Sequence, residues 1–208
     1  MKTHISLPAS LARRRAVQSA VGAVALVMAT GLFTACAPDK PQFQSIDLTG
    51  ADYAQGFSLA DYNGQVRTLK DFSGKVVVVF FGFTQCPDVC PTSLADLAQT
   101  KKLLGSDGDK LQAIFITVDP ERDTPAVMKD YVAGFDAGIV PLSGSMAAVA
   151  EAAKAYRVYY AKHPSKDGGY DMDHSSIIYL MDRQGRFLAN FTHETPPEQI
   201  AAKLRSLV

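Results

Sequence analysis

The chain has no excess of charge of either sign, since its 208 residues include 21 lysines and arginines and 21 aspartates and glutamates. This balance lacks the basic excess that is typical of nucleic-acid-binding proteins, and we therefore expect no nucleic acid as a partner. The sequence also lacks internal repeats and low-complexity tracts, so no repeat array is indicated. Cysteine is scarce as well, with only three residues. The positions of those three cysteines are therefore the main guide to the chemistry of this chain.

Acidic residues are absent from the first 35 positions, which contain four basic residues and an apolar run. The basic residues are Lys2, Arg13, Arg14 and Arg15, and the apolar run extends from 20 to 35. That run is short for a membrane span but suits the core of a signal peptide. It leads into Leu-Phe-Thr-Ala-Cys at 32–36, which is similar to a bacterial lipoprotein processing site. We predict that residues 1–35 are a lipoprotein-type signal peptide or an uncleaved anchor helix, with plain secretion as a third alternative.

Either form of anchor would hold the rest of the chain at the periplasmic face of the bacterial inner membrane. Cys36 would be the lipidated residue after cleavage. Residues 36–49 contain two prolines and few apolar side chains, which predicts a tether. Residues 50–208 then form one domain that is large enough for a hydrophobic core. Without residues 1–35 the chain keeps 17 basic and 21 acidic residues, which still gives no indication of nucleic-acid binding.

The other two cysteines, Cys86 and Cys90, lie between a predicted strand and a predicted helix. Residues 75–81 form a β-branched and aromatic run typical of a strand buried on both faces. Residues 92–104 show the apolar spacing of a helix. Cysteines at such a junction ionise easily, because the amides at a helix N-terminus stabilise a thiolate. If the first helical turn contains both, their sulfurs can converge and either close a disulfide or bind a soft metal such as Cu(I).

A simpler interpretation of the pair is two buried structural thiols. Pro87, Asp88 and the start of a helix argue against it, because they indicate an exposed loop. In an oxidising compartment, an isolated close pair is either a disulfide or is protected by a metal or a reductase.

The remaining pattern predicts a mixed α/β domain. Asn63-Gly64 between short apolar segments indicates a hairpin. The strand at 75–81, the helix at 92–104 and a second buried strand at 111–118 form a βαβ unit with parallel strands. The other expected elements are a helix capped by Thr124, a helix at 146–156, a strand at 158–161, a polar loop at 162–173, hairpin strands at 176–181 and 187–191, and a last helix capped by Thr195 with Pro196 as its first residue. This order is that of a thioredoxin-like fold, with a central mixed sheet flanked by helices and an N-terminal β-hairpin.

His174 is the candidate third ligand. It lies just before the strand at 176–181, where thioredoxins carry a cis-proline that faces their cysteines. We therefore predict that His174 faces Cys86 and Cys90. Two thiolates and an imidazole suit copper in either oxidation state, although zinc would also accept them. The alternative is a surface or hydrogen-bonded histidine, and Asp171 and Asp173 either orient its ring or are only solvated.

Three segments together resemble the Sco/SenC family. They are Cys86-Pro87-Asp88-Val89-Cys90-Pro91, Val118-Asp119-Pro120-Glu121-Arg122-Asp123-Thr124 and Asp173-His174-Ser175, which occur in this order. The similarity covers about residues 50–208. The resemblance implies that Cys86, Cys90 and His174 are the ligands of one copper ion, Cu(I) or Cu(II). It also implies that the second segment shapes a loop near the site.

The same resemblance implies a membrane-tethered metallochaperone, rather than an enzyme, that delivers copper to the binuclear centre of cytochrome c oxidase. The expected partner is the copper-centre subunit of that oxidase, with another copper chaperone or a thiol reductase as a further partner. Members of the family are also implicated in reducing the cysteines of the recipient. Oxidation of the pair to a disulfide would abolish the metal site, so the redox state would control metal loading.

A thiol–disulfide oxidoreductase of the cell envelope is the main alternative, with Cys86 and Cys90 as its redox-active pair. The three residues between the cysteines and the missing cis-proline argue against a general reductase. A peroxiredoxin-like peroxidase shares the fold but needs activating residues around its cysteine. The remaining candidates have simpler interpretations: His163 and His193 solvated, Met172 filling space, and Tyr159, Tyr160, Phe80 and Phe81 in or near the core.

Overall fold

Strand β4 (Val76–Gly82) lies in the middle of the main sheet, and all seven of its residues are buried. The computed structural model describes residues 46–136, 138–166 and 168–208. Within those residues β4 belongs to an eight-stranded sheet. Its strands in spatial order are β1 (Ile46–Asp47), β10 (Phe187–Thr192), β9 (Ile177–Met181), β4, β5 (Leu111–Thr117), β6 (Val140–Ser143), β2 (Leu59–Asp61) and β3 (Val66–Arg67).

Several predictions about the N-terminal part of the chain lie outside the described residues. They are the signal or anchor segment at 1–35, the lipidation of Cys36 and most of the tether at 36–49. The tether range is described from residue 46, where β1 pairs with β10 in antiparallel orientation. The domain boundary at residue 50 stays a prediction. In the ranges that the structure describes, no helix has the length and apolar character needed to cross a membrane.

Helix α2 (Val89–Leu103) connects β4 to β5, and these two strands are parallel. This arrangement confirms the predicted βαβ unit. Helix α3 (Pro125–Ala133) follows β5 and leads to β6, which is also parallel to β5. Thr124 caps α3 as predicted, since its hydroxyl oxygen accepts a hydrogen bond from the Val127 N–H at 3.3 Å. The sequence does not predict β6, because this short strand contains Pro141, and proline is unusual inside a sheet.

Antiparallel pairs complete the sheet on both sides of this parallel centre. Strand β9 pairs with β4 and with β10, and β2 pairs with β3. The turn between β2 and β3 contains Asn63 and Gly64, and Gly64 has a φ of 79°. Such tight hairpin turns need this left-handed conformation, which glycine adopts without strain. Both predicted hairpins are confirmed.

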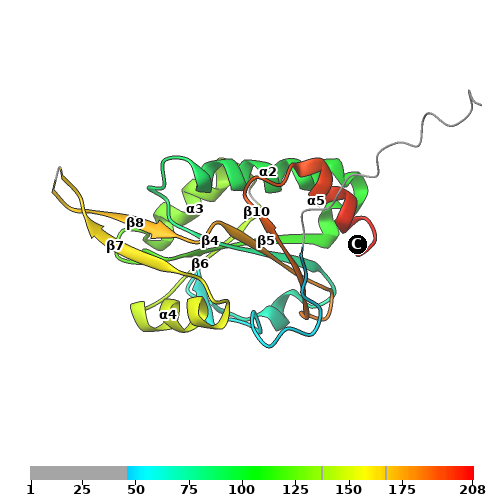
Figure 1. Cartoon of the computed structure of the whole chain (residues 1–208), viewed down its shortest axis with the longest axis horizontal. Helices are drawn as coiled ribbons and strands as arrows, with labels where there is room; N and C mark the ends of the chain where they lie inside the picture. Colours follow the sequence, from blue (N-terminus) through cyan, green and yellow to red (C-terminus); the bar gives the residue numbers. More distant parts are fainter. Residues whose placement is uncertain (1–45, 137, 167) are drawn as a thin grey trace, which may run out of the picture. The chain divides into compact units, whose positions relative to one another are not determined.

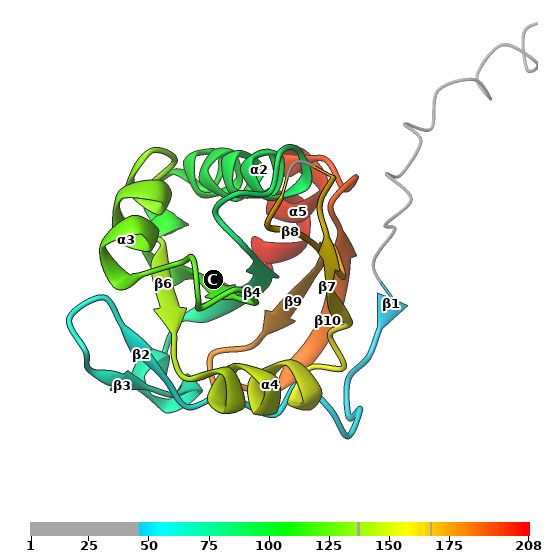
Figure 2. The same ribbon diagram turned by 90° about the vertical axis from the view of Figure 1, so that its left-hand side faces the viewer.

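Helices cover both faces of the sheet (Figures 1 and 2). On one face, α2, α3 and α5 (Pro197–Leu204) bury a core that includes Leu94, Met128 and Ile200. On the other face, α4 (Met146–Ala155) covers a second core. Neighbouring residues of β4 point into different cores, with Phe80 in the first and Phe81 in the second. The thioredoxin-like fold is thus confirmed, and two 3-10 helices, η1 (Leu69–Phe72) and η2 (Gly105–Lys110), complete the described elements.

Two strands form a separate antiparallel sheet, β7 (Tyr160–Pro164) with β8 (Tyr170–His174). We call this element the β7–β8 hairpin; it projects at the left of Figure 1. The predicted strand at 158–161 overlaps only its beginning, and the predicted polar loop at 162–173 is wrong. None of the described side chains in the two strands is fully buried. The apolar alternation that marks a half-buried strand is therefore missing from the sequence.

Two smaller predictions are also wrong. The last helix begins at Pro197 with Pro196 as its cap, one residue later than predicted from Thr195. A residue that precedes proline is biased away from helical conformation, and Pro196 accordingly has an extended ψ of 145°. Tyr159, expected in or near the core, is 62% exposed, whereas Phe80 and Phe81 are fully buried as predicted.

Candidate metal centre

Cys86 and Cys90 lie where β4 ends and α2 begins. Helix α2 starts at Val89, earlier than the predicted residue 92, so its first turn contains Cys90 but not Cys86. Cys90 is fully buried and Cys86 is partly buried, and the predicted exposed loop therefore applies to Cys86 alone. The Cys90 N–H donates to the Cys86 sulfur at 3.4 Å. This bond places the Cys86 sulfur at the positive end of the helix.

Gly82 makes room for the Cys90 sulfur at the end of β4. A Cβ atom at this position would lie 2.5 Å from Cys90 Sγ and 2.9 Å from Phe115 Cε2. A larger residue would therefore displace the sulfur or the ring in a closely packed core. Gly82 is not among the site residues predicted from the sequence. The available signal was a glycine at the end of a buried strand, which often marks a close approach of another group.

His174, the last residue of β8, brings an imidazole to the cysteines. Its Nε2 lies 3.4 Å from Cys90 Sγ, and its Nδ1 lies 3.0 Å from the Ser175 carbonyl oxygen. A carbonyl oxygen only accepts, so Nδ1 carries a hydrogen, and Nε2 is the ring nitrogen that faces the Cys90 sulfur. Phe80 and Phe83 pack against the imidazole in edge-to-face geometry, with centroid distances of 6.0 and 5.7 Å. These contacts hold the plane of the ring.

The aspartates beside His174 do not orient its ring. Side chains along β8 alternate, with Asp171 and Asp173 exposed and His174 partly buried on the opposite face. Asp173 Oδ2 instead pairs with His163 Nε2 at 2.8 Å, and the Ser175 carbonyl supplies the orienting contact. His163, predicted to be solvated, is half exposed and carries this pairing.

Cys86, Cys90 and His174 are the single group of three metal-binding side chains that lie together in the described part of the chain. Their donor atoms are all within 4.8 Å of one another. The structure thus brings together the three residues that the sequence predicts, although 84 positions separate Cys90 from His174. Two sulfurs and one imidazole nitrogen are donors that copper accepts in either oxidation state. Closed structural zinc sites normally have four ligands, so this set fits copper better than structural zinc.

Without a bound metal, the thiols of Cys86 and Cys90 have very different pKa values. A hydrogen bond from the Cys90 thiol lowers the pKa of Cys86 well below the ordinary thiol range, with further help from His174 and two backbone amides. Burial acts in the opposite direction on Cys86 and is outweighed. The same hydrogen bond, together with burial, raises the pKa of Cys90. Cys86 therefore carries the thiolate and Cys90 keeps its proton.

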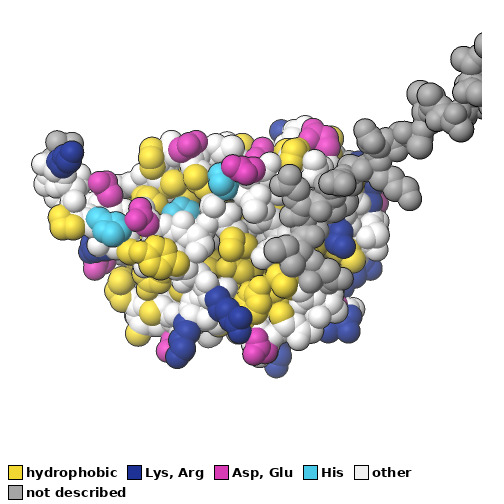
Figure 3. Space-filling model, in the orientation of Figure 1, with side chains coloured by type: hydrophobic (Ala, Val, Ile, Leu, Met, Phe, Trp, Pro, Cys, Tyr) yellow, Lys and Arg dark blue, Asp and Glu magenta, His cyan; other side chains and the backbone are white. Residues whose placement is uncertain are grey.

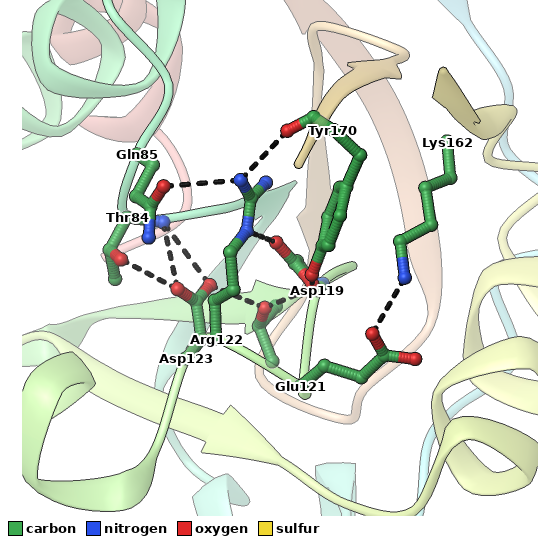
Figure 4. A network of polar contacts seen from close by, with 9 residues as sticks. Thr84, Gln85, Asp119, Glu121, Arg122, Asp123, Lys162 and Tyr170 are labelled. Atoms are coloured by element: carbon green, nitrogen blue, oxygen red, sulfur yellow. Dashed lines mark hydrogen bonds and ion pairs between the residues drawn. The ribbon is translucent and has the colours of Figure 1, made fainter. Parts of the chain in front are cut away.

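The segment 119–123 lies beside Thr84 and Gln85 (Figure 4), which belong to the loop 83–88 between β4 and α2, called here the cysteine loop because it contains Cys86. The buried Asp123 carboxylate accepts hydrogen bonds from the hydroxyls of Thr84 at 2.5 Å and Thr117 at 2.6 Å. Arg122 Nη1 donates to Gln85 Oε1 at 3.1 Å. This segment therefore holds the residues just before Cys86 in place by hydrogen bonding, and it contributes no member of the donor cluster.

The other candidate residues lie outside the donor cluster. Met172 is partly buried and packs against the core under α4, in agreement with a space-filling role. His193 is only partly solvated, because its Nδ1 is buried without a hydrogen-bond partner among the described residues. No cis peptide bond occurs in the described ranges, so the proline geometry of thioredoxins is absent beside His174.

Comparison with known proteins identifies a family and several relatives. The SCO1/SenC family model matches residues 47–208. The mitochondrial SCO2 homolog of Bos taurus is 42% identical over 170 residues, which cover 80% of this chain and 64% of the bovine protein. A SCO2-like protein of Rickettsia felis is 32% identical over 189 residues, which cover 89% of this chain and 91% of the rickettsial protein. The chain thus spans less than two-thirds of the bovine relative and nearly all of the rickettsial one.

Solved structures of similar proteins share the fold. The copper-bound ScoI of Bradyrhizobium japonicum superimposes with a TM-score of 0.68 at 50% identity, covering 74% of this chain and 98% of ScoI. BsSco, described as a member of the Sco family of cytochrome c oxidase assembly proteins with a disulfide switch, has a TM-score of 0.60 at 26% identity. That match covers 78% of this chain and 95% of BsSco.

We predict that Cys86 of the reduced chain reacts with iodoacetamide at pH 6 almost as fast as at pH 8. An ordinary thiol loses roughly a hundredfold of its thiolate over that interval, whereas the lowered pKa of Cys86 keeps its sulfur ionised throughout. Tandem mass spectrometry of the peptide that contains both cysteines would give the two rates. Cys90 should remain unmodified, because it is buried and protonated.

The same chain unfolded in urea provides the control for this labelling experiment. Both cysteines should then slow down in parallel as the pH falls. A folded Cys86 that loses reactivity to the same extent as in the unfolded chain would contradict the assignment of the thiolate.

Proposed function

Because this chain belongs to the SCO1/SenC family, we propose that it binds one copper ion through Cys86, Cys90 and His174 and delivers it to the copper-centre subunit of cytochrome c oxidase. The observation that carries this proposal is the convergence of the three donor atoms within 4.8 Å. Two relatives support it: ScoI was solved with copper bound, and BsSco is described as belonging to a family of cytochrome c oxidase assembly proteins.

The three ligands differ in how much they must change before they can bind the metal. Cys86 is already a thiolate, and His174 Nε2 already faces Cys90. Cys90 must lose its proton to become a thiolate ligand, so copper binding releases a proton from the most deeply buried of the three residues.

Release to a recipient is favoured by the unequal burial of the ligands. Cys86 and His174 are partly exposed, whereas Cys90 is fully buried. Ligands of the recipient can therefore replace Cys86 and His174 while Cys90 still holds the ion. In the face shown in Figure 3, hydrophobic and acidic side chains both lie beside the histidines.

A thiol–disulfide oxidoreductase is the second candidate, and the unequal protonation of the two cysteines favours it. The Cys86 thiolate would attack one sulfur of a partner disulfide, forming a mixed disulfide and releasing one partner thiolate. Cys90, after losing its proton to solvent, would attack the Cys86 sulfur and release the second partner thiolate. The partner would gain two electrons and this chain would end with a Cys86–Cys90 disulfide. Such a reaction would prepare the cysteines of a copper recipient.

We place the protein at the periplasmic face of the inner membrane, anchored through lipidated Cys36 or through an N-terminal helix. The support comes from the sequence of the first 36 residues: a basic start without acidic residues, an apolar run, and a lipoprotein-like site ending at Cys36.

We predict that the reduced full chain binds one copper ion per molecule and shows thiolate-to-Cu(II) charge-transfer absorption. Replacing His174 by alanine removes one of three ligands, and the affinity should fall at least about tenfold, since even the loss of an outer partner of a ligand has effects of this size. His163→Ala is the matched control, because it removes a histidine of the same hairpin that lies outside the donor cluster. Copper binding by both variants is measured from their metal content and their visible absorption. Equal copper affinity of His174→Ala and the parent would overturn the ligand assignment.

Reduction of insulin by the chain distinguishes the two candidate functions. A metallochaperone should show little turnover with insulin. An oxidoreductase should show turnover that survives His174→Ala and is lost in Cys86→Ala, because only the thiolate performs the first attack. Catalytic insulin reduction by a chain that binds no copper would support the second candidate against the first.

Lipid attachment is tested by growth with radiolabelled palmitate. We expect the parent to incorporate label and Cys36→Ser to remain unlabelled, because the serine hydroxyl cannot replace the thiol in lipid attachment. An unlabelled parent in the membrane fraction would indicate the anchor helix instead. Recovery of the parent in the soluble periplasmic fraction would contradict both forms of attachment.

A further inference from the structure

The β7–β8 hairpin carries His174 but is not part of the main sheet. In the described residues β8 pairs with β7 alone, so the ladder hydrogen bonds of the eight-stranded sheet do not include the strand that ends at His174. Cys86, by contrast, lies in the segment that links β4 to α2, and Cys90 lies in the first turn of α2, so both cysteines belong to the body of the domain. The position of the imidazole relative to the sulfurs therefore depends on contacts between the hairpin and the body.

Arg122 makes contacts with both of these ligand-bearing parts (Figure 4). Its Nη1 donates to the carbonyl oxygen of Tyr170, the first residue of β8, at 2.9 Å. The same nitrogen donates to Gln85 Oε1 at 3.1 Å, one residue before Cys86. A single guanidinium group thus joins the strand that ends at His174 to the loop that contains Cys86.

Tyr170 strengthens this junction through its side chain. The Arg122 guanidinium carbon lies 3.9 Å from the centroid of the Tyr170 ring, and Lys162 Nζ lies 3.7 Å from it. Figure 4 shows the ring between the two cations, an arrangement that the negative faces of an aromatic ring stabilise. The Tyr170 hydroxyl donates to Asp119 Oδ1 at 2.7 Å, and Lys162 Nζ donates to Glu121 Oε2 at 2.6 Å. Both strands of the hairpin are therefore tied to the segment 119–122.

The base of this junction is fixed in the body of the domain. Arg122 Nε donates to Asp119, whose side chain is only 3% exposed. The neighbouring Asp123 is held by Thr84 and Thr117, as described above. Arginine suits this position because its planar guanidinium offers several donors in fixed directions and stacks on aromatic rings, whereas the ammonium group of lysine does neither.

We propose that Arg122 is a positioning residue that fastens the β7–β8 hairpin to the cysteine loop and so holds His174 next to Cys90. The effect on copper rests on the proposed function, but the fastening is a property of the metal-free chain. With Arg122 in place, the three donors are preorganised. When its contacts with Tyr170 are broken, the hairpin loses this attachment, so His174 is held less firmly next to Cys90 while both sulfurs stay on the body, and the site binds copper more weakly.

Hydrogen exchange of the reduced, metal-free full chain tests the proposal. In Arg122→Gln, the amides of β7 and β8 should exchange at least about tenfold faster than in the parent, while those of β4 stay protected. Arg186→Gln is the matched control, since Arg186 Nε makes the same type of bond with the buried Asp182, at 2.7 Å, in the turn between β9 and β10. This control should leave exchange in β7 and β8 unchanged. Unchanged exchange of these strands in a folded Arg122→Gln chain would overturn the proposal.

Two further variants keep the test decisive. Arg122→Lys retains the positive charge without the planar fork, and it should loosen the hairpin as Arg122→Gln does; full recovery by lysine would overturn a positioning role. If Arg122→Gln also exposes β4, Tyr170→Leu decides, because it removes the ring against which the Arg122 guanidinium packs and should still speed exchange in β8. Unchanged exchange in β8 of that variant would then overturn the proposal.

Copper titration of the same variants separates this inference from the proposed function. Arg122→Gln should lower copper affinity about 10- to 100-fold, as expected when an outer support of a ligand is lost. If the parent binds no copper, the proposed function fails, while hydrogen exchange still decides the role of Arg122. If the parent binds copper and the hairpin exchanges equally in parent and Arg122→Gln, only the role of Arg122 fails.

Discussion

The Cys90 sulfur packs against the end of β4, at a place where only glycine leaves room for it. This contact sets the start of α2 against the central strand, and with it the direction of the Cys90 N–H that reaches Cys86. A neutral thiol tolerates such burial much better than a thiolate does. The two cysteines therefore differ in protonation before any metal or partner binds: the more accessible Cys86 is a thiolate, and the buried Cys90 keeps its proton.

The three metal-binding side chains come from two parts of the structure. The cysteines come from the rigid body of the domain, and His174 comes from the β7–β8 hairpin, which is less tightly packed. The cysteines belong to the junction of a fully buried strand and a helix, whereas His174 ends a two-stranded sheet with no fully buried side chain among its described residues. A metal carrier has opposing requirements, because it must bind its cargo and also release it. In the site that we propose for copper, the buried Cys90 sulfur serves the first requirement, and the more accessible Cys86 and His174 serve the second.

The segment from Asp119 to Asp123 connects these two parts. Its two buried carboxylates both receive hydrogen bonds, which buried charged groups require. Asp123 bonds a residue of the cysteine loop, and Asp119 bonds Arg122 and Tyr170. The sequence indicates only that this segment shapes a loop near the site. Its contacts with both the loop and the hairpin depend on residues up to 51 positions away.

The sequence alone determined the features that depend on local patterns. The uniform apolar character of 76–81, the glycine turns of the hairpins and the Thr124 cap are each encoded in a few neighbouring residues, and the structure confirms them. Three short segments and their order also predict that the two cysteines and His174 lie together, and the structure places their donor atoms within 4.8 Å of one another. The tertiary structure decided what distant contacts create: strand β6, the β7–β8 hairpin, the sulfur beneath Gly82, and the arginine between Gln85 and Tyr170. These features have no periodic apolar signal, because polar contacts and close approaches between segments far apart in the chain produce them.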